Sequence, residues 1–190
     1  MNMDDLQRQY CDEVMKFRKV LNLTSIKDVD VFYKTFIKPS VLLERWIPKN
    51  AVVLDIGSGM GVPGIPLLIH RPDIQGVLVE RRKKRTEFIR HVLRKLKLNG
   101  QAYDADIHDL EPLKATVCIA RAVSEITVLI HMCDKHIVDG GLAVLPIPND
   151  VTLPDVQGWM LQDEFCEEGA QRVVCYRKQT SLLGGVSRET

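Results

Sequence analysis

A glycine-rich segment with a carboxylate at its start is the part of the sequence whose residue types and spacing most clearly suit ligand binding. It reads DIGSGMG over residues 55–61 and directly follows the apolar run 51–54. Glycine at alternate positions lets the backbone turn tightly and approach a ligand that a Cβ atom would exclude. We therefore expect Gly57, Ser58, Gly59 and Gly61 to bind a nucleotide-like cofactor.

The spacing of the glycines and two nearby carboxylates indicate which cofactor this is. A dinucleotide-binding loop follows G-x-G-x-x-G, and the last position of that pattern is Val62 here rather than glycine. Asp55 can hold a positively charged amino-acid end, and Glu80, which lies 19 residues after Gly61, can accept both hydroxyls of a ribose. S-adenosylmethionine has such an end and no phosphate, so we predict that it is the cofactor. The alternative is a glycine-rich turn with a solvated acid.

Two further residues are expected beside the adenine of this cofactor. The segment Asp104-Ala105-Asp106-Ile107 follows the third predicted strand. This placement puts a carboxylate and a backbone amide next to the ring, and Ile107 can pack against it. Asp106 is equally suited to cap the N-terminus of a short helix, and it can have both roles.

Basic residues are concentrated in the first half of the chain, although the net charge is only +1. Residues 1–100 hold 19 Lys and Arg against 11 Asp and Glu, whereas residues 101–170 hold 3 against 13. The densest run, RRKKR at residues 81–85, follows Glu80 and would attract a phosphate backbone. We assign Arg81, Lys84 and Arg85 to substrate binding, with a solvated helix face as the alternative.

The elements that position these residues alternate between strand-like and helical patterns. Strands are predicted at 51–56, 76–80, 101–104, 116–120, 142–145 and 172–177, and helices at 64–71, 82–98, 124–137 and 155–163. This alternation predicts an α/β fold, a parallel sheet with helices on both faces. Apolar residues at helical spacing from Leu6 to Leu21 and from Val29 to Ile47 predict two helices packed across the sheet. We divide the chain into an N-terminal helical extension, 1–48, and a cofactor-binding domain, 49–190.

Several other functions are not indicated by the sequence. The five cysteines form no C-x-x-C pair, and the five histidines have no ligand spacing, so we expect reduced thiols and no metal. Cys118 lies inside an apolar run and is expected to be a core thiol rather than a nucleophile. The polar start has no secretory pattern and no run is long enough to span a membrane, so we expect a cytoplasmic protein.

The sequence also resembles a known family, ribosomal RNA small subunit methyltransferase G, which is also called glucose-inhibited division protein B. The resemblance covers roughly residues 5 to 145. The matching segments are Asn22-Leu23-Thr24, residues 55–67, Arg71-Pro72, Lys84-Arg85 before Phe88, and Arg121-Ala122. The most specific part is the G-x-P-G-I-P run within residues 61–66.

The resemblance implies a class I, Rossmann-like methyltransferase fold and transfer of a methyl group from S-adenosylmethionine to N7 of a guanine in bacterial 16S ribosomal RNA. It implies that Arg121 lies near the transferred methyl or the target base, as a catalytic and cofactor-contacting residue. Guanine N7 carries a lone pair and no proton, so alignment matters more than a general base. The implied partner is ribosomal RNA or the small ribosomal subunit. The oligomeric state stays open, with a monomer preferred.

The chain departs from the family pattern at positions expected on the substrate side. Lys34-Thr35 and Lys38-Pro39 replace Arg-His and Asp-Ser, and Pro146-Ile147-Pro148 replaces Lys-Gly after the fifth strand. These departures suggest, as one alternative, a methyltransferase of another RNA or of a small molecule. Two alternatives from other classes also stay open: a non-catalytic RNA-binding or ribosome-assembly protein, and a nicotinamide oxidoreductase.

Overall fold

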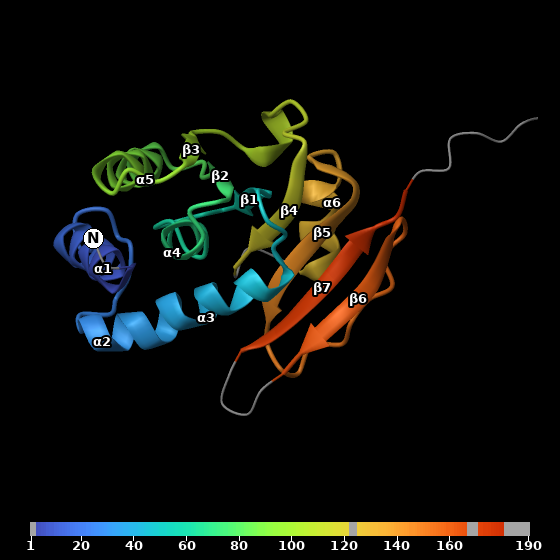
Figure 1. Cartoon of the computed structure of the whole chain (residues 1–190), viewed down its shortest axis with the longest axis horizontal. Helices are drawn as coiled ribbons and strands as arrows, with labels where there is room; N and C mark the ends of the chain where they lie inside the picture. The colour runs from blue at the N-terminus through green and yellow to red at the C-terminus, as the bar shows by residue number, and fades with distance from the viewer. Residues whose placement is uncertain (1–2, 122–124, 167–170, 181–190) are drawn as a thin grey trace, which may run out of the picture.

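The computed structural model of the protein describes residues 3–121, 125–166 and 171–180, and these residues build one seven-stranded sheet (Figure 1). The strand order is β3-β2-β1-β4-β5-β7-β6. Strands β1 to β5 run parallel to one another, and β7 runs antiparallel to both β5 and β6. The strands are β1 (Val52–Ile56), β2 (Gln75–Val79), β3 (Gly100–Tyr103), β4 (Ala115–Ala120), β5 (Ile137–Ile147), β6 (Trp159–Phe165) and β7 (Arg172–Lys178).

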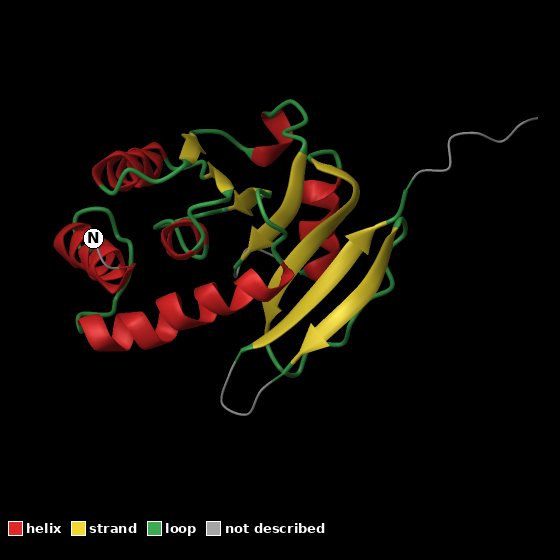
Figure 2. Ribbon diagram, in the orientation of Figure 1, coloured by secondary structure: helices red, strands yellow, loops and turns green. Residues whose placement is uncertain are grey.

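Helices cover both faces of the sheet, as the alternation of patterns predicts (Figure 2). Successive strand residues point to opposite faces, so Val53 packs into one core and Leu54 into the other. The first core is shared with α1 (Met3–Phe17), α4 (Gly64–His70) and α5 (Lys83–Lys95), and the second with η3 (Ile107–Asp109) and α6 (Ile126–Asp134). Because β1 to β5 run parallel, their carboxyl ends meet at one edge of the sheet, which is where ligands bind in open α/β sheets.

The N-terminal extension packs on the sheet, as predicted. After α1, the chain runs through α2 (Val29–Phe32), the π-helical turn η1 (Tyr33–Ile37), α3 (Lys38–Leu42) and the 3-10 turn η2 (Leu43–Trp46), which together form one rod in Figure 2. Tyr10, Phe32 and Ile37 from this extension are fully buried in the same core as α4 and α5. The division at residue 48 stays a prediction, and the shared core joins the extension to the sheet.

Two predicted elements differ from the structure. The predicted helix at 155–163 is wrong, because the edge strand β6 begins at Trp159. Met160 and Leu161 of this strand are about half exposed, so it lacks the alternation by which a strand is recognised. The helix predicted to end at Ile137 ends at Asp134, and its start at Ser124 lies outside the described residues.

An ion-paired cluster fastens α1 to α5. The Glu13 side chain is buried, and its two carboxylate oxygens accept hydrogen bonds of 2.6 Å from His91 Nε2 and Lys95 Nζ. Burial alone raises the pKa of Glu13, but the hydrogen bonds from Lys95 and His91 outweigh it and hold the pKa below its usual value. The cluster therefore stabilises the fold while Glu13 is ionised.

We predict that Glu13→Gln lowers the free energy of unfolding at pH 7 by about 1 kcal/mol, because the partners are partly solvated. The folded-state pKa is the lower one, so the contribution is present above the unfolded pKa and disappears as the pH falls through the folded pKa. Urea unfolding from pH 3 to 7 measures the difference. The control is Glu87→Gln, which removes an exposed pair with Arg90. An equal loss of unfolding free energy in both variants would show that the Glu13 cluster does not stabilise the fold in this way.

Candidate functional site

The loop after β1 has the backbone conformation that its glycines make possible. Gly57, Gly59 and Gly61 all have positive φ, at 68°, 60° and 96°. A Cβ atom on Gly61 would also lie 2.3 Å from Ile65 Cδ1, so a larger residue fits there only if the Ile65 side chain shifts. The amides of Gly57 and Ser58 both donate to the carbonyl of Val79, at 2.9 and 3.1 Å, which holds the loop against the end of β2.

Glu80 fixes the far side of this loop. Its carboxylate accepts a 3.0 Å hydrogen bond from the Gly59 amide through one oxygen and a 2.8 Å bond from the Arg82 amide through the other. The Glu80 carbonyl accepts a further bond of 2.7 Å from Thr86 Oγ1 at the start of α5. Glu80 is only 6 % exposed, yet it lines the cavity described below. The end of β2 thus carries an oriented acid whose remaining lone pairs face a ligand-sized space.

Asp55 lies buried below the loop and is not among the residues that line the cavity, and its contact with the cofactor stays a prediction. One carboxylate oxygen accepts a 3.0 Å bond from the Gly64 amide at the start of α4, and the other has no hydrogen-bond partner within the described part of the chain. Burial and, to a smaller extent, the charge of Glu80 raise the pKa of Asp55 to about 7, although the hydrogen bonds from Gly64 and Ser58 lower it. Asp55 therefore supports the second half of the loop.

Tyr10 of α1 braces the loop from its other side. The Tyr10 hydroxyl, which is fully buried, donates a 2.9 Å hydrogen bond to the carbonyl of Met60. Burial raises the pKa of Tyr10 well above its usual value, so the hydroxyl keeps its proton. The sequence offers no signal for this role, because Tyr10 appears there only as one apolar position of a helix.

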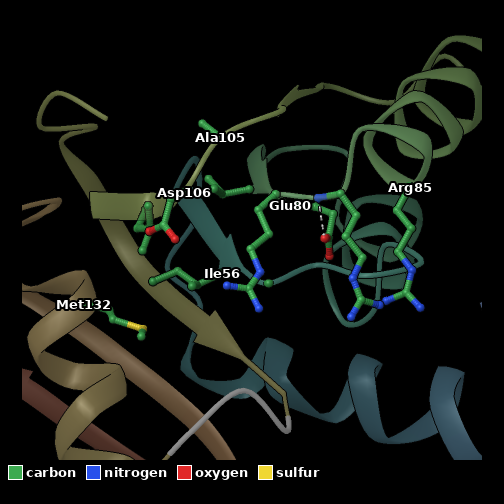
Figure 3. A pocket seen from close by; sticks show the side chains of 11 residues that line it. Ile56, Glu80, Arg85, Ala105, Asp106 and Met132 are labelled. Carbon is green, nitrogen blue, oxygen red and sulfur yellow. Dashed lines mark hydrogen bonds between the residues drawn. The ribbon is translucent and has the colours of Figure 1, made fainter. Parts of the chain in front are cut away.

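A cavity of about 320 Å³ opens at the carboxyl ends of β1 and β2 (Figure 3). Its wall combines apolar side chains, one buried acid and three arginines. Arg85 and Met132 lie at opposite ends of it in Figure 3. The lining residues are Ile56, Gly57, Val79, Glu80, Arg81, Arg82, Arg85, Ala105, Asp106, Ile107 and Met132.

The structure brings half of the predicted site residues to this cavity. Gly57, Glu80, Arg81, Arg85, Asp106 and Ile107 line it. Asp106 also caps η3, because its side chain accepts a 3.0 Å bond from the His108 amide. The lining residues that the site prediction missed are Ile56, Val79, Arg82, Ala105 and Met132. Of these, Met132 comes from the far face of the sheet, on α6, and no local sequence pattern points to it.

Six predicted residues lie away from the cavity lining, and Asp55, described above, is one of them. Gly59 and Gly61 shape the loop, and Ser58 is buried beneath it with its hydroxyl donating to the Asp55 carbonyl. Lys84 lines a separate apolar groove between the end of α1 and the start of α5. Arg121, directly after β4, reaches the N-terminal rod instead, where Nη2 donates to the Thr35 carbonyl at 3.1 Å.

Within the described ranges, no group of three or more His, Cys, Asp or Glu residues has the arrangement of a metal site. Among the same residues, no helix is long and apolar enough to cross a bilayer. Cys118 is 1 % exposed and belongs to the second core, as predicted.

We predict that Asp55→Asn changes how stability depends on pH. The folded-state pKa of about 7 lies above the usual 3.8, so the charged form is disfavoured and the parent loses stability as the pH rises from about 4 to 7. Asparagine keeps an oxygen for the Gly64 amide and does not titrate, so the variant should gain roughly 4 kcal/mol relative to the parent over this range. Thermal unfolding from pH 4 to 8 measures it. The exposed Asp150→Asn is the control, and a flat difference for Asp55→Asn would contradict this account.

Comparison of the sequence with known proteins identifies the family to which the chain belongs. The family model described as "rRNA small subunit methyltransferase G" matches residues 3–146. Proteins named ribosomal RNA small subunit methyltransferase G are 30% identical to the chain in Ruegeria pomeroyi, over 72% of this chain and 69% of that protein, and in Neisseria gonorrhoeae, over 78% and 77%.

Solved methyltransferase structures share the fold. An RNA methyltransferase from Salinibacter ruber in complex with S-adenosyl-L-homocysteine has a TM-score of 0.57 at 16% identity, covering 75% of this chain and 90% of that one. A SAM-dependent methyltransferase from Aquifex aeolicus has a TM-score of 0.60 at 12% identity, covering 77% and 92%. The fold is therefore the class I, Rossmann-like methyltransferase fold that the resemblance implied. With the family model matching most of its length, the chain belongs to the rRNA small subunit methyltransferase G family.

Proposed function

We propose that this protein transfers the methyl group of S-adenosylmethionine to N7 of a guanine in 16S ribosomal RNA. The observation that carries the proposal is the cavity beside the glycine loop, where Glu80 is held by the Gly59 amide at the carboxyl edge of the sheet. Membership of the family supports the cofactor and the class of RNA. The names of the relatives support the small-subunit RNA as the substrate.

The residues around the cavity fit the parts of this cofactor. Glu80 has a carboxylate for the ribose hydroxyls, and the apolar side chain of Ile107 suits the face of an adenine. The close backbone at Gly57 leaves room for the methionine part, whose carboxylate would suit Arg81 or Arg85. When bound, the cofactor supplies a methyl group on a positively charged sulfur. The buried Asp55 contributes by fixing the loop through the hydrogen bond that it accepts from the Gly64 amide.

The residues around the cavity can bind the cofactor, align it with the target base and attract the RNA. No general base is needed among them, because guanine N7 carries no proton that must be removed before it reacts. Arg121, at the carboxyl end of β4, is the residue we assign to orienting the target base. The basic run that includes Arg81, Lys84 and Arg85 would bind the phosphate backbone beside the cavity. Such an RNA substrate places the protein in the cytoplasm, where we propose that it acts as a monomer.

We predict that Glu80→Gln weakens binding of S-adenosylmethionine and of its demethylated product by about tenfold or more, since hydrogen bonds to a charged acceptor contribute roughly 1.5–3 kcal/mol each. The amide group of glutamine cannot accept from both Gly59 and Arg82, so the loop is loosened as well. Isothermal titration calorimetry measures the affinity. Glu87→Gln on the exposed face of α5 is the matched control, and equal affinity in the two variants would contradict the assignment.

Labelled methyl transfer tests the substrate. Purified small subunits that lack base methylation should accept label from the parent protein, and much less from Glu80→Gln when the cofactor concentration is limiting. Tight cofactor binding with no label in 16S RNA would contradict this substrate and favour another RNA or a small molecule. Binding of a nicotinamide dinucleotide in place of S-adenosylmethionine would overturn the enzyme class.

A further inference from the structure

A proline interrupts the hydrogen bonding of the N-terminal rod and leaves one carbonyl without its usual partner. In a regular α-helix the amide of residue 39 would donate to the carbonyl of Thr35, but Pro39 has no N–H. The Lys38 amide donates to the carbonyl of Tyr33, five residues back, which makes the π turn η1. The Thr35 carbonyl is therefore available at this turn, and turns of this kind occur often at functional sites.

Arg121 donates a hydrogen bond to the Thr35 carbonyl, which has no amide partner at Pro39. Its Nη2 donates to the Thr35 oxygen at 3.1 Å, and its guanidinium carbon lies 4.6 Å from the centroid of the Phe36 ring. A guanidinium over an aromatic face gains a cation–π attraction. Both partners of Arg121 thus come from one turn, although they lie 86 and 85 positions away from it in the chain.

The turn leaves much of the guanidinium free for a ligand. Arginine has five N–H donors, and one of them is used at Thr35. Within the described residues, Arg121 has no ion pair with a carboxylate. Arg121 also directly follows β4, so it stands at the carboxyl edge of the sheet, next to β1 and its glycine loop.

We propose that Pro39 and Phe36 are positioning residues: the π turn they shape is a seat that holds the Arg121 guanidinium in one orientation for the target base. This rests on the proposed function. Under it, the remaining N–H groups donate to an acceptor such as guanine O6, next to N7, whereas adenine presents a donor there. The seat also gives a role to Pro39, one of the departures from the family pattern.

The test of the seat uses the purified protein and does not depend on activity. Nitrogen-15 NMR of arginine side chains reports hindered rotation of a guanidinium, and Arg121→Lys identifies the signals of Arg121. We expect separate Nη signals for Arg121 in the parent. Pro39→Ala restores an amide that competes for the Thr35 carbonyl, and Phe36→Leu removes the ring, so both should collapse these signals. Phe36→Tyr keeps the aromatic ring and should show the same separate Nη signals as the parent.

The control is Pro112→Ala, in an exposed loop before β4, which should leave the Arg121 signals unchanged. Circular dichroism melting checks that each variant is folded, and Phe36→Leu stands in if Pro39→Ala fails to fold. Unchanged Arg121 signals in Phe36→Leu and Pro39→Ala, or freely rotating signals in the parent, would overturn the seat.

The second arm measures methyl transfer to small subunits. Misplacing an aligning group should lower kcat by about ten- to a hundredfold in Pro39→Ala and Phe36→Leu, with the affinity for S-adenosylmethionine unchanged and with rescue in Phe36→Tyr. A loss of cofactor affinity equal to the loss of kcat would overturn the positioning role and indicate a structural one. If the parent transfers no methyl group, the proposed function fails, and the NMR result still decides whether the seat exists.

Discussion

The hydrogen bond between the Gly59 amide and the Glu80 carboxylate is the contact on which the site depends. It joins the loop after β1 to the residue that directly follows β2, across the two neighbouring strands whose carboxyl ends form the cavity. Gly59 has a φ of 60°, so this amide points at Glu80 from a backbone conformation that most residues avoid. Because the second Glu80 oxygen is held by Arg82, the acid cannot swing away, and the loop and the basic segment share one anchor.

The N-terminal extension takes part in building the site rather than being a separate appendage. Tyr10 holds the loop at Met60 from below, and the Thr35 carbonyl receives Arg121 from the end of β4. The first helix is in turn fastened to α5 by the ion pairs of Glu13. Three sets of contacts distant in sequence thus connect the extension to the elements that line or flank the cavity. The Tyr10 bond is buried, the Glu13 ion pairs are partly buried, and the bond from Arg121 to Thr35 is exposed.

The sequence predicts the parts of the site that lie on short local patterns. The glycine spacing, the acid at the end of β2 and Asp106-Ile107 after β3 could all be placed, because the carboxyl ends of parallel strands share one edge. The burial of Asp55 and the brace from Tyr10 could not, since both depend on how α1 and α4 pack over the loop. Arg121 was assigned through the family resemblance, but its orientation depends on a missing amide at Pro39, 82 positions earlier. The strand β6 escaped detection because it is defined by pairing with β7 rather than by its own pattern.

The most direct test of the central claim is a map of N7-methylguanine in 16S ribosomal RNA from cells with and without this protein. Borohydride reduction followed by aniline cleavage cuts the chain at such bases and gives their positions. The account predicts one position that is cut in the parent, lost in the deletion strain, restored by the parent gene and not restored by Glu80→Gln. Identical cleavage patterns in the parent and deletion strains would contradict it.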